Sequence, residues 1–183
     1  TNRVAKTWNA GIKDDSWHHI NFTRNGTIMN AYVDGMIPSV DTTSTEIGGN
    51  SFGFTDKPFV IGTDTHYNAY MHGYFDEVRV IKGAAHPPRF YLGNQTPAAG
   101  GSLTAFKYVD LNGTDDYYRY TADDADFDFS GTQSFSISAW VYHDDSTTSG
   151  TEQTIFGNQD TGSPYHGYKL ATAGGKFYFQ LKG

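Results

Sequence analysis

Short runs of alternating apolar and polar residues, separated by turn signals, are the feature that most limits what this chain can form. Residues 17–24, WHHINFTR, alternate about Ile20 and Phe22, and Asn25-Gly26 follows, a strong hairpin signal. The next run, IMNAYVDG, closes at Asp34-Gly35. This stretch therefore predicts two antiparallel strands joined by a tight turn.

The same alternation recurs along the rest of the chain. It predicts strands at 58–62, 73–82, 106–111, 116–121, 134–142, 153–157, 167–171 and 176–181. The sequence contains 13 Tyr, 13 Phe and 21 Gly, and this composition agrees, because aromatic side chains fit pleated surfaces and Gly supplies positive φ in turns. Strands at this density favour an all-β sandwich or barrel.

Charge and cysteine content narrow the classes of partner. The net charge is −7, and an acidic chain without a basic stripe repels phosphate backbones, which argues against a nucleic-acid partner. The sequence has no Cys, which suits a cytosolic protein or an extracellular bacterial or viral one. It has no apolar segment of membrane-spanning length. The one clear compositional change, GNQTPAAGGSLT at 93–104, predicts a linker between segments 1–92 and 105–183.

Both segments resemble halves of one known domain. WHHINFTRNGTIMNAYVDG, followed by FVIGTDTHYNAYMHGYFDEVRVIKGAA, resembles the C-terminal half of a laminin-G-like domain of the concanavalin A-like lectin/glucanase superfamily. The run from FKYVDLNGTDDYYRY to GKFYFQL resembles the N-terminal half. The resemblance implies an antiparallel jelly-roll β-sandwich. DEVRVIKGAA looks most like the versions found in bacteriophage virion proteins.

The two halves stand in the reverse of the family order. The family domain opens with the LNG..DY strand and finishes with the DEVRV strand, whereas here the finishing half comes first. Three arrangements follow: a circularly permuted sandwich, one register of a tandem array, or half-domains exchanged between neighbouring molecules. We expect a compact permuted sandwich, with residues near Gly183 and Thr1 close together in one molecule or between neighbours.

The acidic run Asp124-x-Asp126-x-Asp128 suggests two kinds of site, and neither fits. Superfamily glucanases carry Glu-x-Asp-x-Glu, but all three positions here are Asp. An EF-hand loop needs Gly and Glu where Phe129 and Phe135 stand. We therefore expect a protein without catalytic residues.

A calcium site outside an EF-hand is implied by the resemblance. Superfamily members often hold Ca²⁺, and the first and last strands of the family domain lie side by side. This would bring Asp110 and Asn112 near Asp76, and Ca²⁺ prefers such oxygen ligands. The alternative is that Asp76 is a buried, hydrogen-bonded structural acid.

A ligand patch is predicted where aromatic and histidine residues fall in loops at the rim. Rim loops carry function in such scaffolds, and aromatic rings stack on the apolar faces of sugars. Trp17 and Trp140 are interpreted as packing anchors, Trp8 could be exposed, and one of His18 and His19 should face the core. The patch comprises Tyr67, Tyr70, His72, Tyr165 and His166.

The core candidates come from the same alternation. They are Phe22, Tyr32, Val33, Val60, Val78, Val80, Phe135, Ile137, Trp140, Ile155 and Leu170, although neighbours such as Tyr32 and Val33 cannot both point inward.

Together the sequence predicts a non-catalytic binding or structural module of an extracellular assembly, foremost a bacteriophage virion fibre or decoration protein that binds glycans. A repeat of a bacterial surface adhesin is the alternative. A glycoside hydrolase ranks third, because the Glu pair is missing. The expected partners are a cell-surface glycan or neighbouring copies of the protein, without membrane insertion, and the expected location is extracellular or on the virion surface.

Overall fold

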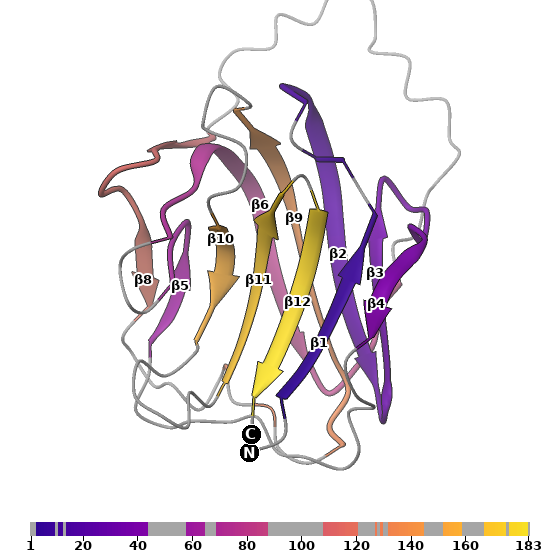
Figure 1. Ribbon diagram of the computed structural model, residues 1–183. Helices are drawn as coiled ribbons and strands as arrows, with labels where there is room; N and C mark the ends of the chain where they lie inside the picture. Colours follow the sequence, from indigo (N-terminus) through magenta and orange to yellow (C-terminus); the bar gives the residue numbers. More distant parts are fainter. Residues whose placement is uncertain are drawn as a thin grey trace, which may run out of the picture.

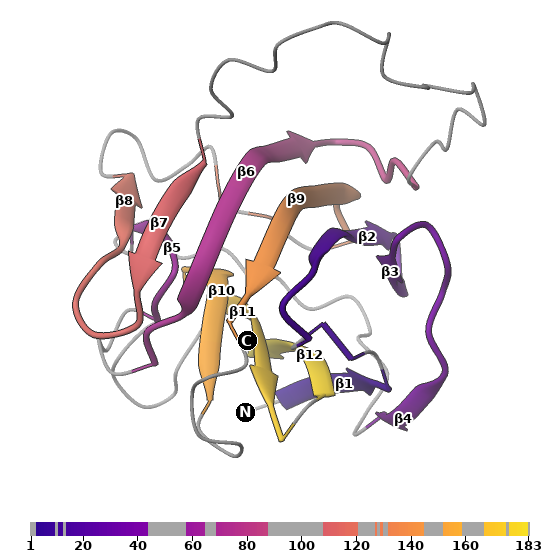
Figure 2. The ribbon, with the colours of Figure 1, turned by 90° about the horizontal axis from the view of Figure 1, so that it is seen from above.

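Strands from both segments build two antiparallel sheets that lie face to face (Figures 1 and 2). The computed structural model describes residues 3–9, 11–12, 14–43, 58–64, 69–87, 108–120, 127, 129, 132–144, 152–158, 167–174 and 176–182. Within these residues no helix is long and apolar enough to cross a membrane. The expected all-β sandwich is confirmed.

One sheet has seven strands, in the order β4-β1-β12-β11-β10-β5-β8. Their bounds are Val40–Thr43, Arg3–Trp8, Lys176–Lys182, Gly167–Ala173, Gln153–Gly157, Phe59–Ile61 and Tyr118–Tyr120, in that order. The other sheet has five strands, in the order β3-β2-β9-β6-β7. These run Ile28–Val33, Trp17–Asn25, Phe135–His143, His72–Lys82 and Val109–Asn112.

The predicted strands are confirmed, with their ends shifted by a few residues, and β1 and β4 are additional. β1 pairs with β12, and β4 pairs with β1. These two strands escaped prediction because RVAKTW and VDTT lack a clear apolar face, and β1 forms against a strand from the other end of the chain.

The strands nearest the two chain ends, β1 and β12, lie side by side within one molecule (Figure 1). Arg3 is paired with Lys182 and Trp8 with Phe177 in the β1–β12 ladder, which confirms the expected proximity. Strands from 1–92 and 105–183 also alternate in both sheets, since β9 lies between β2 and β6, and β10 to β12 lie between β5 and β1. One chain therefore completes the sandwich. The predicted linker, 93–104, lies outside the described residues.

Aromatic stacking forms the centre of the core. Phe22 of β2 stacks on Phe179 of β12 with ring centroids 3.6 Å apart, and Phe129 stacks on Phe135 of β9 at 3.9 Å. All four side chains are fully buried. Contacts of this kind contribute about 0.5–1.5 kcal/mol each beyond the burial of apolar area.

Most of the predicted core is confirmed. Phe22, Val60, Phe135, Ile137, Ile155 and Leu170 are buried, and Val33, Val78 and Val80 are partly buried against the core. Tyr32 is half-buried and outside the core cluster, because Val33 takes the inward position beside it.

The tryptophan predictions are wrong in all three cases. Trp140 is 38% exposed, because Ala139 and Val141 on either side of it point inward. Trp17 is 40% exposed, because Ile20 and Phe22 set the inward face of β2. Trp8 is fully buried, opposite Phe177 and against the edge of Phe22 at 6.3 Å.

The opposite burial of two tryptophans gives a direct test of this packing. Replacing Trp8 with Ala should lower the free energy of unfolding by about 3–5 kcal/mol, because it opens a cavity in the core. Replacing Trp140 with Ala should cost only about 1 kcal/mol, since it loses chiefly a surface ring contact. Denaturant unfolding of the two variants measures both values, and equal losses would contradict these placements.

Candidate functional site

A recess of about 500 Å³ opens on the outer face of the five-stranded sheet. It is lined by Trp17 of β2, Trp140 of β9, Asp76 and Glu77 of β6, and Tyr108, which immediately precedes β7. Four elements that are distant in sequence therefore contribute to one site. Its volume falls within the range of about 300–1,000 Å³ that is usual for small-molecule sites.

Strand register explains why these side chains meet. One row across the sheet places Trp17 opposite Tyr142, and Tyr142 opposite Tyr74. The next row places His19 opposite Trp140, and Trp140 opposite Asp76. Residues two apart on a strand share a face, so both rows point outward while the intervening residues fill the core.

The aromatic rings of the recess support one another. Trp17 contacts Tyr74, Tyr108 and Tyr142 with centroid distances of 6.4, 6.3 and 5.9 Å. Tyr74 in turn lies 4.8 Å from Tyr108 and 5.4 Å from Tyr142. These contacts hold the rings in place before a ligand arrives, which reduces the entropy lost on binding.

The lining rings nevertheless remain open to solvent. Trp17, Tyr108 and Trp140 are 40%, 50% and 38% exposed. Exposed apolar side chains that gather in one patch mark a binding site, whereas single exposed apolar residues are common on any protein surface.

A β-bulge in β6 positions the carboxylate of Glu77 beside that of Asp76. The register of β6 against β9 shifts between Asp76 and Arg79, and Glu77 has a φ of 49°. Its backbone N–H donates a 2.8 Å hydrogen bond to Asp76 Oδ1. Positive φ is unfavourable for a non-glycine residue, and bulges often redirect a side chain beside a functional site. Here the bulge sets two carboxylates beside three aromatic rings.

The titratable groups around the rings leave the recess acidic. Desolvation, followed by the carboxylates of Asp15 and Asp144, raises the pKa of Tyr142, so this phenol stays neutral. Burial lowers the pKa of His19, which lies edge-on to Trp140 at 5.3 Å, although Asp34 and Glu77 oppose the shift. At neutral pH the charge of the described lining residues is therefore negative.

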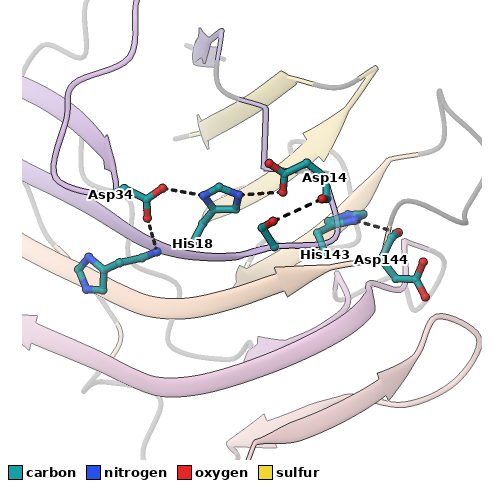
Figure 3. Close-up of polar contacts among 7 residues, drawn as sticks. Asp14, His18, Asp34, His143 and Asp144 are labelled. Atoms are coloured by element: carbon teal, nitrogen blue, oxygen red, sulfur yellow. Dashed lines mark hydrogen bonds and ion pairs between the residues drawn. The ribbon is translucent and has the colours of Figure 1, made fainter. Parts of the chain in front are cut away.

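His18, which follows Trp17 in β2, is held by two carboxylates in an arrangement that we call the His18 clamp (Figure 3). His18 lies between two carboxylates, with Nε2 2.9 Å from Asp14 Oδ1 and Nδ1 2.7 Å from Asp34 Oδ2. Asp34 also accepts a 2.9 Å hydrogen bond from the backbone N–H of His19. Burial disfavours the charged imidazole, but the hydrogen bonds to Asp34 and Asp14 outweigh it and raise the pKa of His18. The clamp ties the segment before β2 to the turn after β3.

The predicted rim patch is placed only in part. Tyr67, Tyr165 and His166 lie outside the described residues. Tyr70 is half-buried just ahead of β6, and His72 begins that strand. His72 Nδ1 lies 3.3 Å from Asp144 Oδ2, and its backbone N–H donates to Gln153 Oε1. The patch stays a prediction. The acidic run Asp124, Asp126 and Asp128 is likewise outside the described residues.

The predicted calcium ligands lie on neighbouring strands. β6 and β7 pair as expected, with Tyr74 opposite Asp110 and His72 opposite Asn112. Asp76 is the next outward residue after Tyr74, and so lies diagonal to Asp110.

The side-chain oxygen of Asn112 is a poor candidate ligand for Ca²⁺, because it already accepts hydrogen bonds. Its Oδ1 accepts hydrogen bonds from the backbone N–H groups of Thr114 at 2.8 Å and Asp115 at 3.1 Å. The described part of the chain also contains no group of three or more His, Cys, Asp or Glu suited to a metal. Calcium at these residues stays a prediction.

Comparison with known proteins agrees with the lectin-type sandwich. Residues 2–88 match the model of a laminin-G-like family, described as the concanavalin A-like lectin/glucanases superfamily. This stretch is therefore laminin-G-like, as the sequence resemblance predicted. No curated protein and no solved structure matches the chain. Trp17, Asp76 and Glu77 fall within the matched stretch, whereas Tyr108 and Trp140 fall outside it.

Sequence reasoning assigned the recess residues to other roles. Trp17 and Trp140 were expected in the core, and Asp76 was expected to bind calcium. A usable signal was present, since SISAWVY and WHHINF both place an aromatic residue one position out of phase with their smaller apolar neighbours. Two outward aromatic residues on different strands predict an exposed aromatic surface only when the strands are known to pair.

Stability should depend on pH through the His18 clamp. Because the pKa of His18 is raised in the folded state, its stabilisation is fully present below the unfolded value of 6.5 and is lost as pH rises through the folded value. Compared with His18→Asn, the wild type should therefore lose more of its free energy of unfolding as pH rises above 6.5. The exposed His86 offers a matched control, since His86→Asn should keep the wild-type slope. Identical slopes in all three proteins would contradict the clamp.

Calcium binding has a separate test. If Ca²⁺ binds beside Asp76 and Asp110, the melting temperature should rise with free Ca²⁺ and fall with EDTA, because a ligand of the native state stabilises it by mass action. Asp110→Asn should weaken this response. A melting temperature that neither Ca²⁺ nor EDTA changes would remove the calcium prediction.

Proposed function

We propose that this protein is a non-catalytic glycan-binding module of an extracellular assembly, and that the recess on the five-stranded sheet is its ligand site. One observation carries the proposal: three exposed aromatic rings from different parts of the chain and two carboxylates of β6 line a single recess. Aromatic rings pack on the apolar faces of sugars, and carboxylates accept hydrogen bonds from hydroxyl groups. The family match of residues 2–88 supports a binding module.

The arrangement of the carboxylates argues against hydrolysis. Glycosidases place two carboxyl groups on either side of the scissile bond, and their general acid is kept protonated by an apolar surrounding. Asp76 and Glu77 are consecutive on one strand, Asp76 accepts the backbone hydrogen bond of Glu77, and Glu77 is exposed. We therefore expect binding without turnover.

The assembly is proposed from the sequence. The likeness of DEVRVIKGAA to virion proteins favours a bacteriophage fibre or decoration protein on the virion surface, and a bacterial adhesin repeat is the alternative. In both settings the expected partner is a cell-surface glycan, with neighbouring copies of the same protein as a second contact.

Glycan binding can be followed by tryptophan fluorescence. Of the three tryptophans, Trp17 and Trp140 line the recess and Trp8 is buried, so a bound glycan should change the emission of the two exposed ones. Trp17→Ala should weaken binding by about tenfold or more, because it removes a central aromatic anchor. Tyr118→Ala removes an exposed ring from β8 in the other sheet and should leave the affinity unchanged.

A panel of neutral, basic and acidic oligosaccharides covers the ligand classes, and a reducing-sugar assay on the same panel should stay at background. Saturable binding that Trp17→Ala and Tyr118→Ala weaken equally would show that the ligand binds elsewhere. The absence of binding to any glycan would contradict the proposed function. If the wild type releases reducing ends and Glu77→Gln does not, the protein is an enzyme and the proposal of binding without turnover is wrong.

A further inference from the structure

We infer that the recess recognises a basic glycan, one whose sugar units carry a protonated, unacetylated amino group. This inference rests on the proposed function and narrows its ligand class. It follows from the charge of the recess, from the absence, among the described residues, of a cation paired with its carboxylates, and from the two indole rings that line it.

Among the described residues that line the recess, the charge has one sign. Asp76 and Glu77 are acidic, whereas Trp17, Tyr108 and Trp140 are uncharged at neutral pH. Asp110 adds a third carboxylate on the same face, opposite Tyr74. An anionic sugar would meet like charge here, and a cationic group would meet complementary charge.

The cations nearby do not neutralise these carboxylates. His19 lies against Trp140, and burial lowers its pKa, so it is neutral at pH 7. Arg79 lies beyond the bulge, opposite Ser138, in the next outward pair after Asp76 and Trp140. Among the described residues, neither Asp76 nor Glu77 forms an ion pair. The recess therefore presents two carboxylates that a ligand cation can pair with.

The aromatic lining favours the same group. An ammonium over the face of an indole ring is attracted by the ring quadrupole, and Trp is the strongest partner for this interaction. Trp17 and Trp140 line the recess together with the carboxylates, so one amine could contact a ring and form a charge-assisted hydrogen bond at once. An acetylated amine loses both contributions because it is uncharged.

A matched ligand pair tests the inference directly. The two ligands are the trimers of glucosamine and of N-acetylglucosamine, which share a sugar ring but differ in whether its amino group can carry a positive charge. Calorimetric titration measures the affinity for each at about pH 6, where a primary amine is protonated. We expect the glucosamine trimer to bind about tenfold more tightly, and this preference to shrink as salt is added.

Variants locate the preference in the recess. Glu77→Gln and Asp76→Asn should each weaken binding of the glucosamine trimer more than binding of the acetylated trimer, and so reduce the preference for the amine. Glu77→Asn provides a second variant, since Asn tolerates positive φ well. Asp115→Asn is the matched control, an exposed carboxylate in the loop after β7, and should keep the preference. Thermal melting confirms that each variant is folded.

The outcomes separate this inference from the proposed function. Equal affinity for the two trimers, a preference for the acetylated one, or binding only to neutral or acidic glycans would overturn the inference and keep glycan binding. A preference that persists in both Glu77 variants and in Asp76→Asn would also overturn it. Failure to bind any glycan would contradict the proposed function as well.

Discussion

Strand β9 pairs with β2 on one side and β6 on the other, and both the core and the recess depend on these two ladders. β2 and β6 come from the segment before residue 93 and β9 from the segment after 104, so neither segment holds a complete five-stranded sheet. The inward side chains of β9, such as Phe135 and Ile137, complete the core. Its outward side chains Trp140 and Tyr142 join the aromatic rows of the outer face.

The same pairing explains why the site is a composite. Trp17 and the two carboxylates come from the stretch that matches the laminin-G-like family, whereas Tyr108 and Trp140 come from the other segment. The bulge at Glu77 is the local departure from regular strand geometry that allows two consecutive residues of β6 to line the recess. The β6–β9 ladder continues before the bulge at Gly73–Asp76 and after it at Arg79–Lys82. This pairing holds the positive φ of Glu77 in place, so the carboxylates are positioned before a ligand arrives.

Much of the fold could be predicted from the sequence, because strand alternation and turn residues are local signals. The Asn25-Gly26 turn and the inward pair Ile20 and Phe22 illustrate this. The proximity of the chain ends could also be predicted, since the two segments resemble complementary halves of one domain. The recess could not, because its lining residues stand from position 17 to position 140 and meet only through the register of four strands.

The sequence by itself determined where most of the strands lie, that they form a lectin-type sandwich, and that the net charge is acidic. Tertiary structure alone decided the burial of each tryptophan. In SFSISAWVY, apolar residues occupy both phases of the alternation, so the pattern does not say whether Trp140 or its neighbours point inward. Trp8 is buried because β12, from the other end of the chain, pairs with β1 and brings Phe177 opposite it, and because Phe22 of the facing sheet packs against it. The physical reason is that alternation is a property of one strand, whereas burial and the joining of distant side chains into a site are properties of paired and stacked sheets.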